Sequence, residues 1–260
     1  MLKSKKKIIV FTGGSGRFGS ILKKRKLNHK VFFPTKKELN ITNVRSIEKY
    51  LKKKKPNILI HMAALSRPMK IHEKNITKSI NLNIIGSANI ASVCASRKIK
   101  LIYFSTLYVY PGTTGNYKES DTLLPVNNYG WSKLGGECAT QMYKNSLILR
   151  ICMTEKPFTH KNAFSDIKTN FIFHEDLIPI LMKLLNKKGI INLGGPTKTV
   201  YDFAKKYKLE IKQVIKPQLK EQNQENAYTG DGILINSEFL DGLNVKEAKQ
   251  VLHHAQNHSF

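Results

Sequence analysis

The chain has 260 residues, of which 44 are Lys or Arg and 18 are Asp or Glu, so its formal net charge is +26. This length suits one large domain, or a nucleotide-binding domain with a small appendage. No apolar run is long enough for a membrane span or a signal peptide, so we expect no membrane partner and a cytoplasmic location.

The positive charge is spread along the chain instead of being gathered in one block. Lysines cluster at residues 3–7, 23–26, 52–55 and 187–188, and no stripe of aromatic and basic residues accompanies them. We therefore expect no specific nucleic-acid partner, only a general attraction for anionic ligands. Cys94, Cys138 and Cys152 are odd in number and lack C-x-x-C spacing, which indicates reduced thiols and no metal site.

The stretch at residues 8–22, IIVFTGGSGRFGSIL, predicts a buried strand, a glycine-rich turn and the start of a helix. Glycines let the backbone approach a ligand closely, and the first turn of a helix favours negative charge. The pattern Gly13-x-x-Gly16-x-x-Gly19 therefore predicts a diphosphate site. The alternative is a plain tight turn, because three glycines alone are a weak signal.

The next elements bear on which dinucleotide would bind. Residues 15–26 predict a helix and residues 30–33 a second strand, which Pro34 ends. An acidic residue after this strand would favour NAD, but the first acid is Glu38. Lys36, Lys37 and Arg17 would instead attract a 2′-phosphate, so we expect NADP(H) to be preferred, with NAD(H) as the alternative. If Lys36 and Lys37 are ordinary surface lysines, this preference does not follow.

Strands and helices continue to alternate along the first half of the chain. We expect a helix at residues 44–54 capped by Thr42 or Asn43, a strand at 58–62, a long helix at 75–97 and a strand at 101–104. Apolar strands separated by helices predict an α/β fold, a Rossmann-type doubly wound parallel sheet. Gly13, Ala63 and Thr106 would then share the carboxyl edge of the sheet, where ligands bind in such folds.

Residues 128–137, NYGWSKLGGE, place Tyr129 and Lys133 four positions apart, on one face of a helix. A cation beside a phenol lowers its pKa and makes it a useful proton donor and acceptor. Thr106 would supply a hydroxyl for a substrate carbonyl. The alternative is a half-buried tyrosine beside a solvated lysine, since the Y-x-x-x-K spacing also occurs by chance.

The second half is less informative. We expect a strand at residues 147–151 and a loop at 154–169 that offers Lys156, His160 and Lys161 to a substrate diphosphate. His174 is expected to pack or cap a turn, and His253, His254 and His258 to belong to a frayed tail. The remaining expectations are helices at 177–186, 200–207 and 245–254, a strand at 190–193 and a loop at 216–232.

In combination these motifs resemble the extended short-chain dehydrogenase/reductase family. The matching segments are TGGSGRFG, HMAA, LNIIGSANI, STLYVY and YGWSKLGGE, in the family's order over residues 7–151. Within that family, ELNIT, STLYVYPG, NYKESD, LPVNNYGWSKLGGE and LILR are most similar to the dTDP-4-dehydrorhamnose reductase subgroup. The resemblance implies a Rossmann domain at 1–153 and a small C-terminal substrate-binding portion at 154–260, of which 171–207 returns to the Rossmann sheet.

The resemblance also implies roles for matching residues. Tyr129 would protonate a sugar keto oxygen while a nicotinamide delivers hydride, Lys133 would hold the nicotinamide ribose, and Thr106 would bind the keto oxygen. Asn83 would support the proton path. The remaining cofactor-binding positions implied by the resemblance are Gly13, Gly16, Arg17, Phe18, Gly19, Lys36, Asn40, Ile41, Ala63 and Ala64. The implied activity is NADP(H)-dependent reduction of a nucleotide-activated 4-keto-6-deoxy sugar.

Two departures from the family pattern keep alternatives open. Leu107 stands where the reductase has an acid, and without the acidic pair of the dehydratases the chain cannot perform dehydration. A sugar-nucleotide epimerase, which needs only the hydroxyl, tyrosine and lysine, is not excluded. The arginine-bearing C-terminal segment that holds the nucleotide is not recognisable, which leaves room for a non-catalytic cofactor-binding regulatory protein. The family's dimers form through the helices that hold Asn83 and Lys133, so a homodimer is also expected.

Overall fold

A six-stranded, fully parallel sheet forms the centre of the structure, a computed structural model that describes residues 6–112, 115–207 and 210–215. The strand order is β10-β5-β4-β3-β1-β2. The strands are β1 (Ile8–Thr12), β2 (Lys30–Phe32), β3 (Ile58–His61), β4 (Lys100–Thr106), β5 (Ser146–Ile151) and β10 (Gly189–Leu193). The order reverses beside β1, as in a doubly wound sheet, so the predicted Rossmann-type fold is confirmed.

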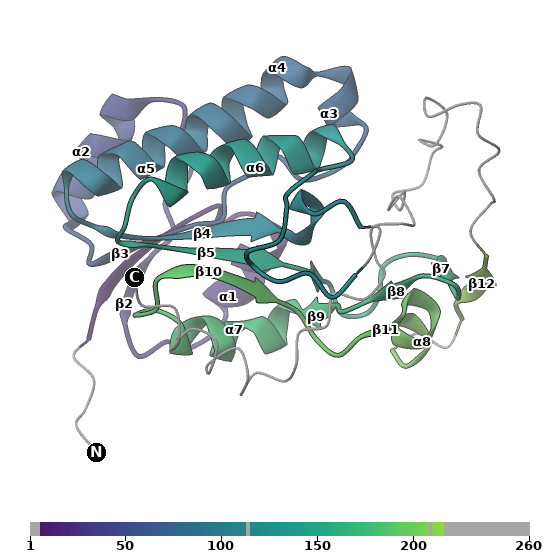
Figure 1. The fold of residues 1–260 in the computed structure, drawn as a ribbon. Coiled ribbons are helices and arrows are strands. Elements are labelled where there is room, and N and C mark those ends of the chain that lie inside the picture. Colours follow the sequence, from purple (N-terminus) through teal and green to yellow (C-terminus); the bar gives the residue numbers. More distant parts are fainter. Residues whose placement is uncertain (1–5, 113–114, 208–209, 216–260) are drawn as a thin grey trace.

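Helices cover both faces of this sheet (Figure 1). Helices α1 (Arg17–Lys23) and α7 (His174–Lys183) pack on one face, where Phe18, Leu22 and Leu177 are buried among strand residues. On the other face lie α2 (Val44–Lys54), α5 (Gly86–Ser96) and α6 (Asn128–Gln141). Because both faces are covered, the strands are apolar almost throughout, which is why they were readable from the sequence.

Local capping explains where several helices begin and end. Helix α2 has the predicted bounds, and its cap is Asn43, whose side chain accepts a hydrogen bond from the Ser46 amide at 3.0 Å. Lys55 ends the helix in the left-handed conformation, with φ +46°, immediately before Pro56. In α6 the side chain of Asn127 caps the first turn, which fixes the start of the helix that bears Tyr129.

The long helix predicted at residues 75–97 is not one continuous α-helix. It consists of α4 (Ile76–Ser79), a π-helical segment η1 (Ile80–Ile85) and α5, and a separate short helix, α3 (Ile71–Lys74), precedes it. Asn75 caps α4 by accepting a bond from the Lys78 amide. The wider π turn changes the direction of the side chains within it, and it contains Asn83.

The prediction of a loop at residues 154–169 was wrong in part, because this region contains short strands. Strand β7 (Asn162–Phe164) pairs with β12 (Lys212–Val214), and β8 (Lys168–Thr169) pairs with β11 (Lys198–Thr199). Phe158, Ala163 and Ile167 pack against residues of α8 (Val200–Lys205) and form an apolar cluster with them. The strands here are only two or three residues long, too short for hydrophobic periodicity in the sequence to indicate them. This small lobe lies beyond one end of the sheet (Figure 1). The remaining short strands, β6 (Met153–Thr154) and β9 (Ile172–Phe173), pair with each other.

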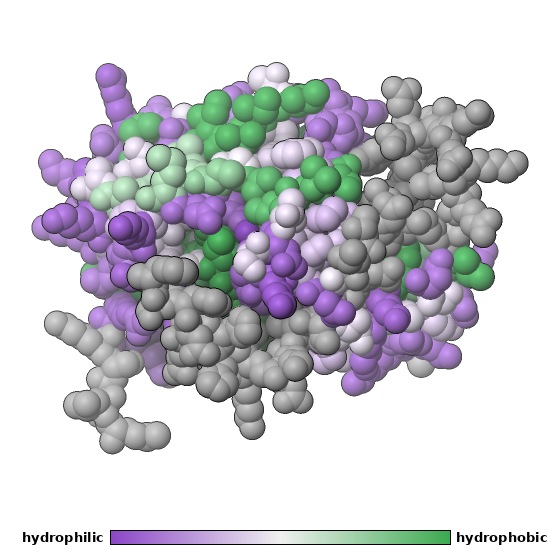
Figure 2. All heavy atoms as spheres, viewed as in Figure 1, coloured by the Kyte–Doolittle hydropathy of each residue, from purple (hydrophilic) through white to green (hydrophobic). Residues whose placement is uncertain are grey.

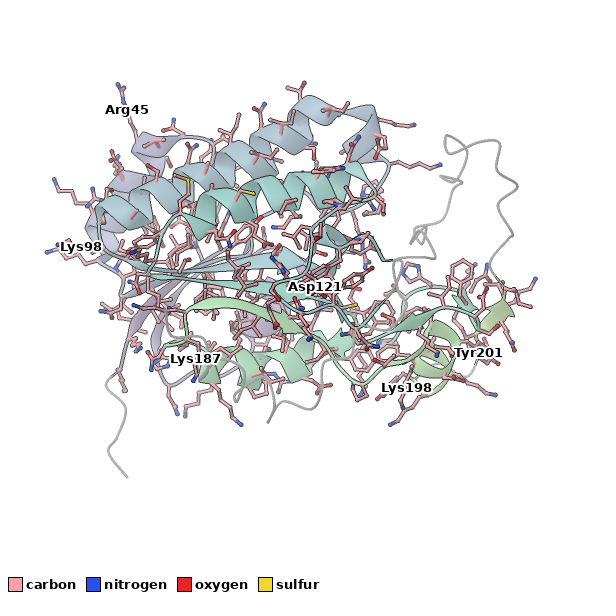
Figure 3. All side chains as sticks on the ribbon, in the orientation of Figure 1. Arg45, Lys98, Asp121, Lys187, Lys198 and Tyr201 are labelled. Atoms are coloured by element: carbon pink, nitrogen blue, oxygen red, sulfur yellow. The ribbon has the colours of Figure 1, made fainter. Side chains whose placement is uncertain are left out.

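The surface carries dispersed charge and one apolar area. The labelled side chains Arg45, Lys98, Lys187 and Lys198 lie at separate edges of the molecule (Figure 3). Apolar side chains gather over the helical layer (Figure 2), where the exposed residues include Ile76, Ile80, Ile85 and Trp131. Within the described ranges, no helix has the length and apolar character needed to cross a bilayer. The predictions for residues 216–232, 245–254 and the C-terminal histidines lie outside the described residues.

Candidate active site

The glycine turn after β1 opens on a cavity of about 380 Å3 at the carboxyl edge of the sheet. Gly13 has φ +77°, and a Cβ there would lie 2.7 Å from the amide nitrogen of Ala63. A Cβ on Gly19 would lie 2.6 Å from the Gly13 carbonyl oxygen. Both positions therefore require glycine, since neither backbone neighbour can give way. The absence of side chains leaves backbone facing the cavity, a surface that fits a diphosphate.

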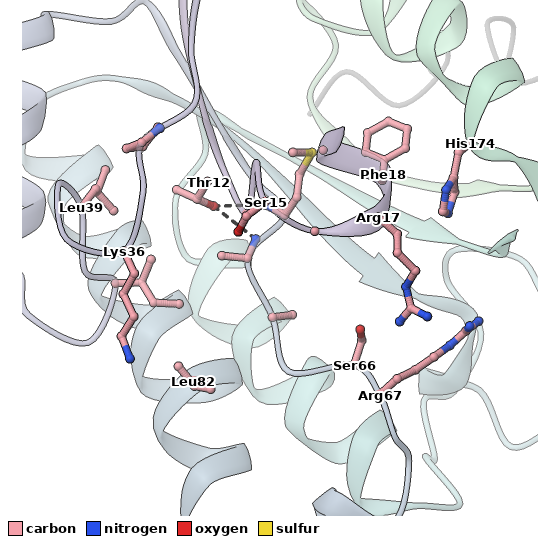
Figure 4. Close-up of a pocket in the computed structure, with 18 of the residues that line it drawn as sticks. Thr12, Ser15, Arg17, Phe18, Lys36, Leu39, Ser66, Arg67, Leu82 and His174 are labelled. Atoms are coloured by element: carbon pink, nitrogen blue, oxygen red, sulfur yellow. Dashed lines mark hydrogen bonds between the residues drawn. The ribbon is translucent and has the colours of Figure 1, made fainter. Parts of the chain in front are cut away.

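The cavity brings together most of the expected cofactor residues (Figure 4). Those that line it are Gly13, Gly16, Arg17, Phe18, Gly19, Lys36, Asn40, Ile41, Ala63 and Ala64. The sequence reasoning missed Ser15, Ser66, Arg67, Met153, Glu155 and His174, which also line it. Ser66 and Arg67 directly follow the segment HMAAL at the end of β3, and this adjacency was the one available signal for them.

Buried hydrogen bonds hold β1 and β3 together beneath the cavity. The Thr12 hydroxyl oxygen accepts from the Met62 and Ala63 amides, each at 3.2 Å (Figure 4). It also lies 2.7 Å from Nδ1 of His61. The other ring nitrogen of His61 lies 3.1 Å from the Ser87 hydroxyl oxygen. Burial lowers the pKa of His61 to about 3, so the ring is neutral. The histidine of the HMAA motif therefore fastens two strand ends and is not a catalytic base.

The polar residues at the Lys36 end of the cavity differ in how freely they face it. Lys36 is exposed. The Asn40 side chain instead accepts hydrogen bonds from the amide and hydroxyl of Thr42, at 3.1 and 2.9 Å. Asn40 thus shapes its own turn, whereas the Lys36 ammonium can reach an anion in the cavity.

The three expected catalytic residues come from β4 and α6. Thr106 ends β4, and its hydroxyl oxygen accepts from the Tyr108 amide at 3.3 Å. The Thr106 side chain is also placed to hydrogen-bond the phenol of Tyr129, in the first turn of α6. Because Thr106 already accepts from an amide, its own proton can point to the phenol oxygen. None of Thr106, Tyr129 and Lys133 lines the cavity described above.

Burial raises the pKa of Tyr129, while the Thr106 hydrogen bond and the Arg67 charge lower it. Lys133 is buried, and its ammonium lies 4.2 Å from the centre of the Tyr103 ring. Burial lowers the pKa of Lys133 to about 7, against the opposing charge of Glu137. We expected Lys133 to lower the pKa of Tyr129; the groups that lower it in the structure are instead Thr106 and Arg67.

His72, which the sequence reasoning did not single out, packs against Tyr129. The two ring centres are 5.1 Å apart, and the Tyr108 ring lies edge-on to Tyr129 at 5.6 Å. His72 is buried, with Nδ1 2.7 Å from the Ser79 hydroxyl oxygen, and burial lowers its pKa to about 4. A neutral ring of this kind confines the phenol without adding charge.

Asn83 is buried within the π-helical segment, away from the cavity lining. Its side chain exchanges hydrogen bonds with both backbone groups of Leu65, at 2.7 and 2.9 Å, and donates to the Ser132 hydroxyl at 2.9 Å. These contacts fasten the segment after β3 to α6. At the position after Thr106, where the reductases that the sequence resembles have an acidic residue, this chain has Leu107, which is buried.

The polar residues from the second half of the chain that we expected at a substrate diphosphate do not line this cavity. Lys156 lies over the rings of Phe173 and Tyr207, and His160 contacts Phe158; neither residue lines the cavity, and Lys161 does not line it either. His174 packs edge-on against Phe18 at 5.6 Å, the packing role expected for it. Across the described part of the chain, no group of three or more His, Cys, Asp or Glu residues could hold a metal ion.

Two family descriptions match parts of the chain. The family described as RmlD substrate binding domain matches residues 6–163. The family described as leucyl-tRNA synthetase, editing domain matches residues 187–257, most of which lie outside the described ranges.

Two curated relatives and one solved structure illustrate the likeness. The chain is 35% identical over 44% of its length to methionine adenosyltransferase 2 subunit beta of Xenopus laevis, covering 34% of that protein. It is 27% identical over 73% of its length to dTDP-4-dehydrorhamnose reductase of Aggregatibacter actinomycetemcomitans, covering 62% of it. The chain thus spans less than two thirds of these relatives. The structure of dTDP-4-dehydrorhamnose reductase from Bacillus anthracis in complex with NADP matches with a TM-score of 0.74 and 23% identity, covering 82% of this chain and 86% of that one.

Proposed function

Because this chain belongs to the RmlD substrate binding domain family, we propose that it is an NADP(H)-dependent reductase of a nucleotide-activated 4-keto-6-deoxy sugar. The observation that carries the proposal is that Thr106 and Tyr129 are placed to hydrogen-bond each other, with Lys133 one turn further along α6. Strand β4 ends, and α6 begins, at the same sheet edge as the glycine turn. Such an arrangement suits proton transfer to a carbonyl oxygen.

The proposed chemistry divides between hydride and proton transfer. When bound, the reduced dinucleotide supplies the hydride. Tyr129 donates its phenolic proton to the keto oxygen, and the phenolate that results is stabilised by the Thr106 hydroxyl and the Arg67 charge, the two groups that lower its pKa. In this scheme Lys133 holds the nicotinamide ribose. The glycine turn, Arg17 and the Ala63–Ala64 backbone bind the remainder of the cofactor.

Lys36 supports the preference for NADP(H) over NAD(H). It lines the cavity, is exposed, and no acidic residue shares the turn that follows β2 before Glu38. The Glu38 carboxylate bonds the Thr35 amide and hydroxyl, at 2.8 and 3.0 Å, and does not line the cavity. A 2′-phosphate would therefore meet a cation without a competing carboxylate.

We further propose that the protein acts as a homodimer in the cytoplasm. The apolar side chains exposed on α4, η1 and α6 include Ile80 and Trp131, at 40% and 49% exposure. An exposed apolar area on adjacent helices is typical of an association surface. Light scattering of the purified protein tests the dimer, and Ile80→Glu should shift it to the monomer.

Turnover measurements test the reductase. The purified protein should oxidise NADPH only with a 4-keto-6-deoxy sugar nucleotide present. Tyr129→Phe should lower kcat by about a hundredfold or more while NADPH affinity stays unchanged. Tyr143→Phe, just beyond the C-terminal end of α6 and at the opposite end of that helix from Tyr129, is the matched control and should keep full activity.

Two other outcomes would favour other functions. Sugar interconversion without net NADPH consumption would indicate an epimerase. NADPH binding without turnover on any keto sugar would indicate a non-catalytic cofactor-binding protein.

A further inference from the structure

At one end of the cavity, a carboxylate lies between two guanidinium groups, and the three side chains come from different parts of the fold. Arg17 is the first residue of α1, Arg67 lies in the segment after β3, and Glu155 follows β6. The Arg17 Nε lies 3.0 Å from one Glu155 oxygen, and the Arg67 Nη1 lies 3.5 Å from the other. Figure 4 shows the Arg17 and Arg67 side chains extending toward each other across the cavity. We call this arrangement the Arg-Glu-Arg bridge.

The bridge leaves positive charge and hydrogen-bond donors available to a ligand. Two guanidinium groups face one carboxylate, and each guanidinium has five N–H donors. The side chains of Arg17 and Arg67 are 49% and 37% exposed, whereas that of Glu155 is 15% exposed. The two arginine charges also lower the pKa of Glu155, so the carboxylate stays ionised. All three residues line the same cavity as the glycine turn.

A diphosphate site does not itself require a carboxylate. A carboxylate repels a phosphate, and it uses the same donors that a phosphate would use, because arginine binds both kinds of oxyanion through paired N–H groups. Between Arg17 and Arg67, however, the Glu155 carboxylate offsets the repulsion of two like charges.

We propose that Arg17 and Arg67 together bind the diphosphate of the dinucleotide, and that Glu155 is a built-in competitor which the diphosphate displaces. The inference rests on the proposed cofactor site and adds Arg67 and Glu155 to it. Glu155 keeps the two guanidinium groups extended across the cavity until the diphosphate displaces it. The diphosphate carries two negative charges, whereas the Glu155 carboxylate carries one. Cofactor affinity is thereby set below the value that the arginines alone would give.

A purely structural bridge makes the opposite prediction. If Glu155 only held the two arginines in position for the ligand, its removal would let them move and would weaken binding. If Glu155 competes with the ligand, its removal strengthens binding. The sign of the change on Glu155→Gln, which keeps the size of the side chain and removes the charge, decides between the two.

The experiment measures the affinity of the full chain for ADP, adenosine and NADPH by isothermal titration calorimetry. We expect Glu155→Gln to tighten ADP and NADPH about fivefold and Arg67→Gln to weaken them about tenfold, as for a charge at a partly exposed site. Adenosine, which lacks the diphosphate, should bind equally to all variants. The changes in ADP and NADPH affinity caused by these two substitutions should both become smaller at high salt. The controls are Glu48→Gln and Arg45→Gln, exposed on α2, which change net charge by the same amounts and should leave affinity unchanged.

Weaker or unchanged ADP binding in Glu155→Gln overturns the proposal, as does unchanged binding in Arg67→Gln. Lack of ADP binding by the wild-type protein also overturns it. Circular dichroism checks that each variant is folded, and if Arg67→Gln fails that check, Glu155→Gln decides alone. The reductase proposal fails separately: it requires turnover with a keto sugar, whereas the competition between Glu155 and the diphosphate is read from ADP affinity without any turnover.

Discussion

The ion pair between Glu137 and Arg150 fixes α6, the helix of Tyr129 and Lys133, to the sheet. Glu137 is fully buried and Arg150 is 1% exposed. One Glu137 oxygen accepts from Nε and Nη2 of Arg150, at 3.0 and 2.6 Å, and the other accepts from the Ser105 hydroxyl at 2.6 Å. Glu137→Gln leaves a buried guanidinium without its counter-charge. We therefore expect the free energy of unfolding to fall by about 3–5 kcal/mol.

A double substitution isolates the cost of the unpaired charge. Glu137→Leu combined with Arg150→Met removes both charges, so the loss should be smaller than that of Glu137→Gln alone. It will not vanish, because the Ser105 and Tyr110 hydroxyls each lose a partner, at about 1 kcal/mol each. Urea unfolding at neutral pH, followed by far-ultraviolet circular dichroism, gives both values. A loss below about 1 kcal/mol for Glu137→Gln, or a double variant less stable than that single one, would refute this reasoning.

Three further expectations concern the cavity and its supporting helices. Burial lowers the pKa of Lys133 from 10.5 to about 7, so between these pH values the unfolded chain binds one proton more than the folded one and stability should rise with pH. Urea unfolding of Lys133→Met should show a smaller rise, with the remainder coming from Lys100, whose pKa burial lowers to about 8; parallel curves for the two proteins would contradict this. A Cβ on Gly136 would lie 2.6 Å from a backbone carbonyl oxygen, so Gly136→Ala should lose about 1–3 kcal/mol in unfolding experiments, more than Gly135→Ala, whose Cβ meets only a side chain. Lys36→Glu should weaken NADPH binding about tenfold in titrations and leave NADH unchanged, whereas Lys37→Glu, outside the cavity lining, should change neither; equal losses for both cofactors would count against a 2′-phosphate contact.

The sequence by itself determined the sheet and the place of the cofactor cavity. Strands such as residues 8–11 and 101–104 are apolar without interruption because helices cover both of their faces, and that pattern is local. Gly13 and Gly19 were readable for a similar reason, since a Cβ at either position would lie within 3 Å of another backbone atom, which leaves glycine as the only choice. Tyr129 and Lys133 share a helix, so their spacing was sufficient to pair them.

Only the tertiary structure decided which residues approach one another from separate elements. Arg17, Arg67 and Glu155 are far apart in the chain, and only Arg17 belongs to a motif. They meet because β1, β3 and β5 deliver their carboxyl ends to the same edge. Burial is likewise a property of the fold: it is what moves the pKa of Lys133 toward neutrality and sets His72 against the phenol. Local spacing encodes which residues lie on one face, whereas the dielectric surroundings and the charges that tune them depend on packing between distant segments.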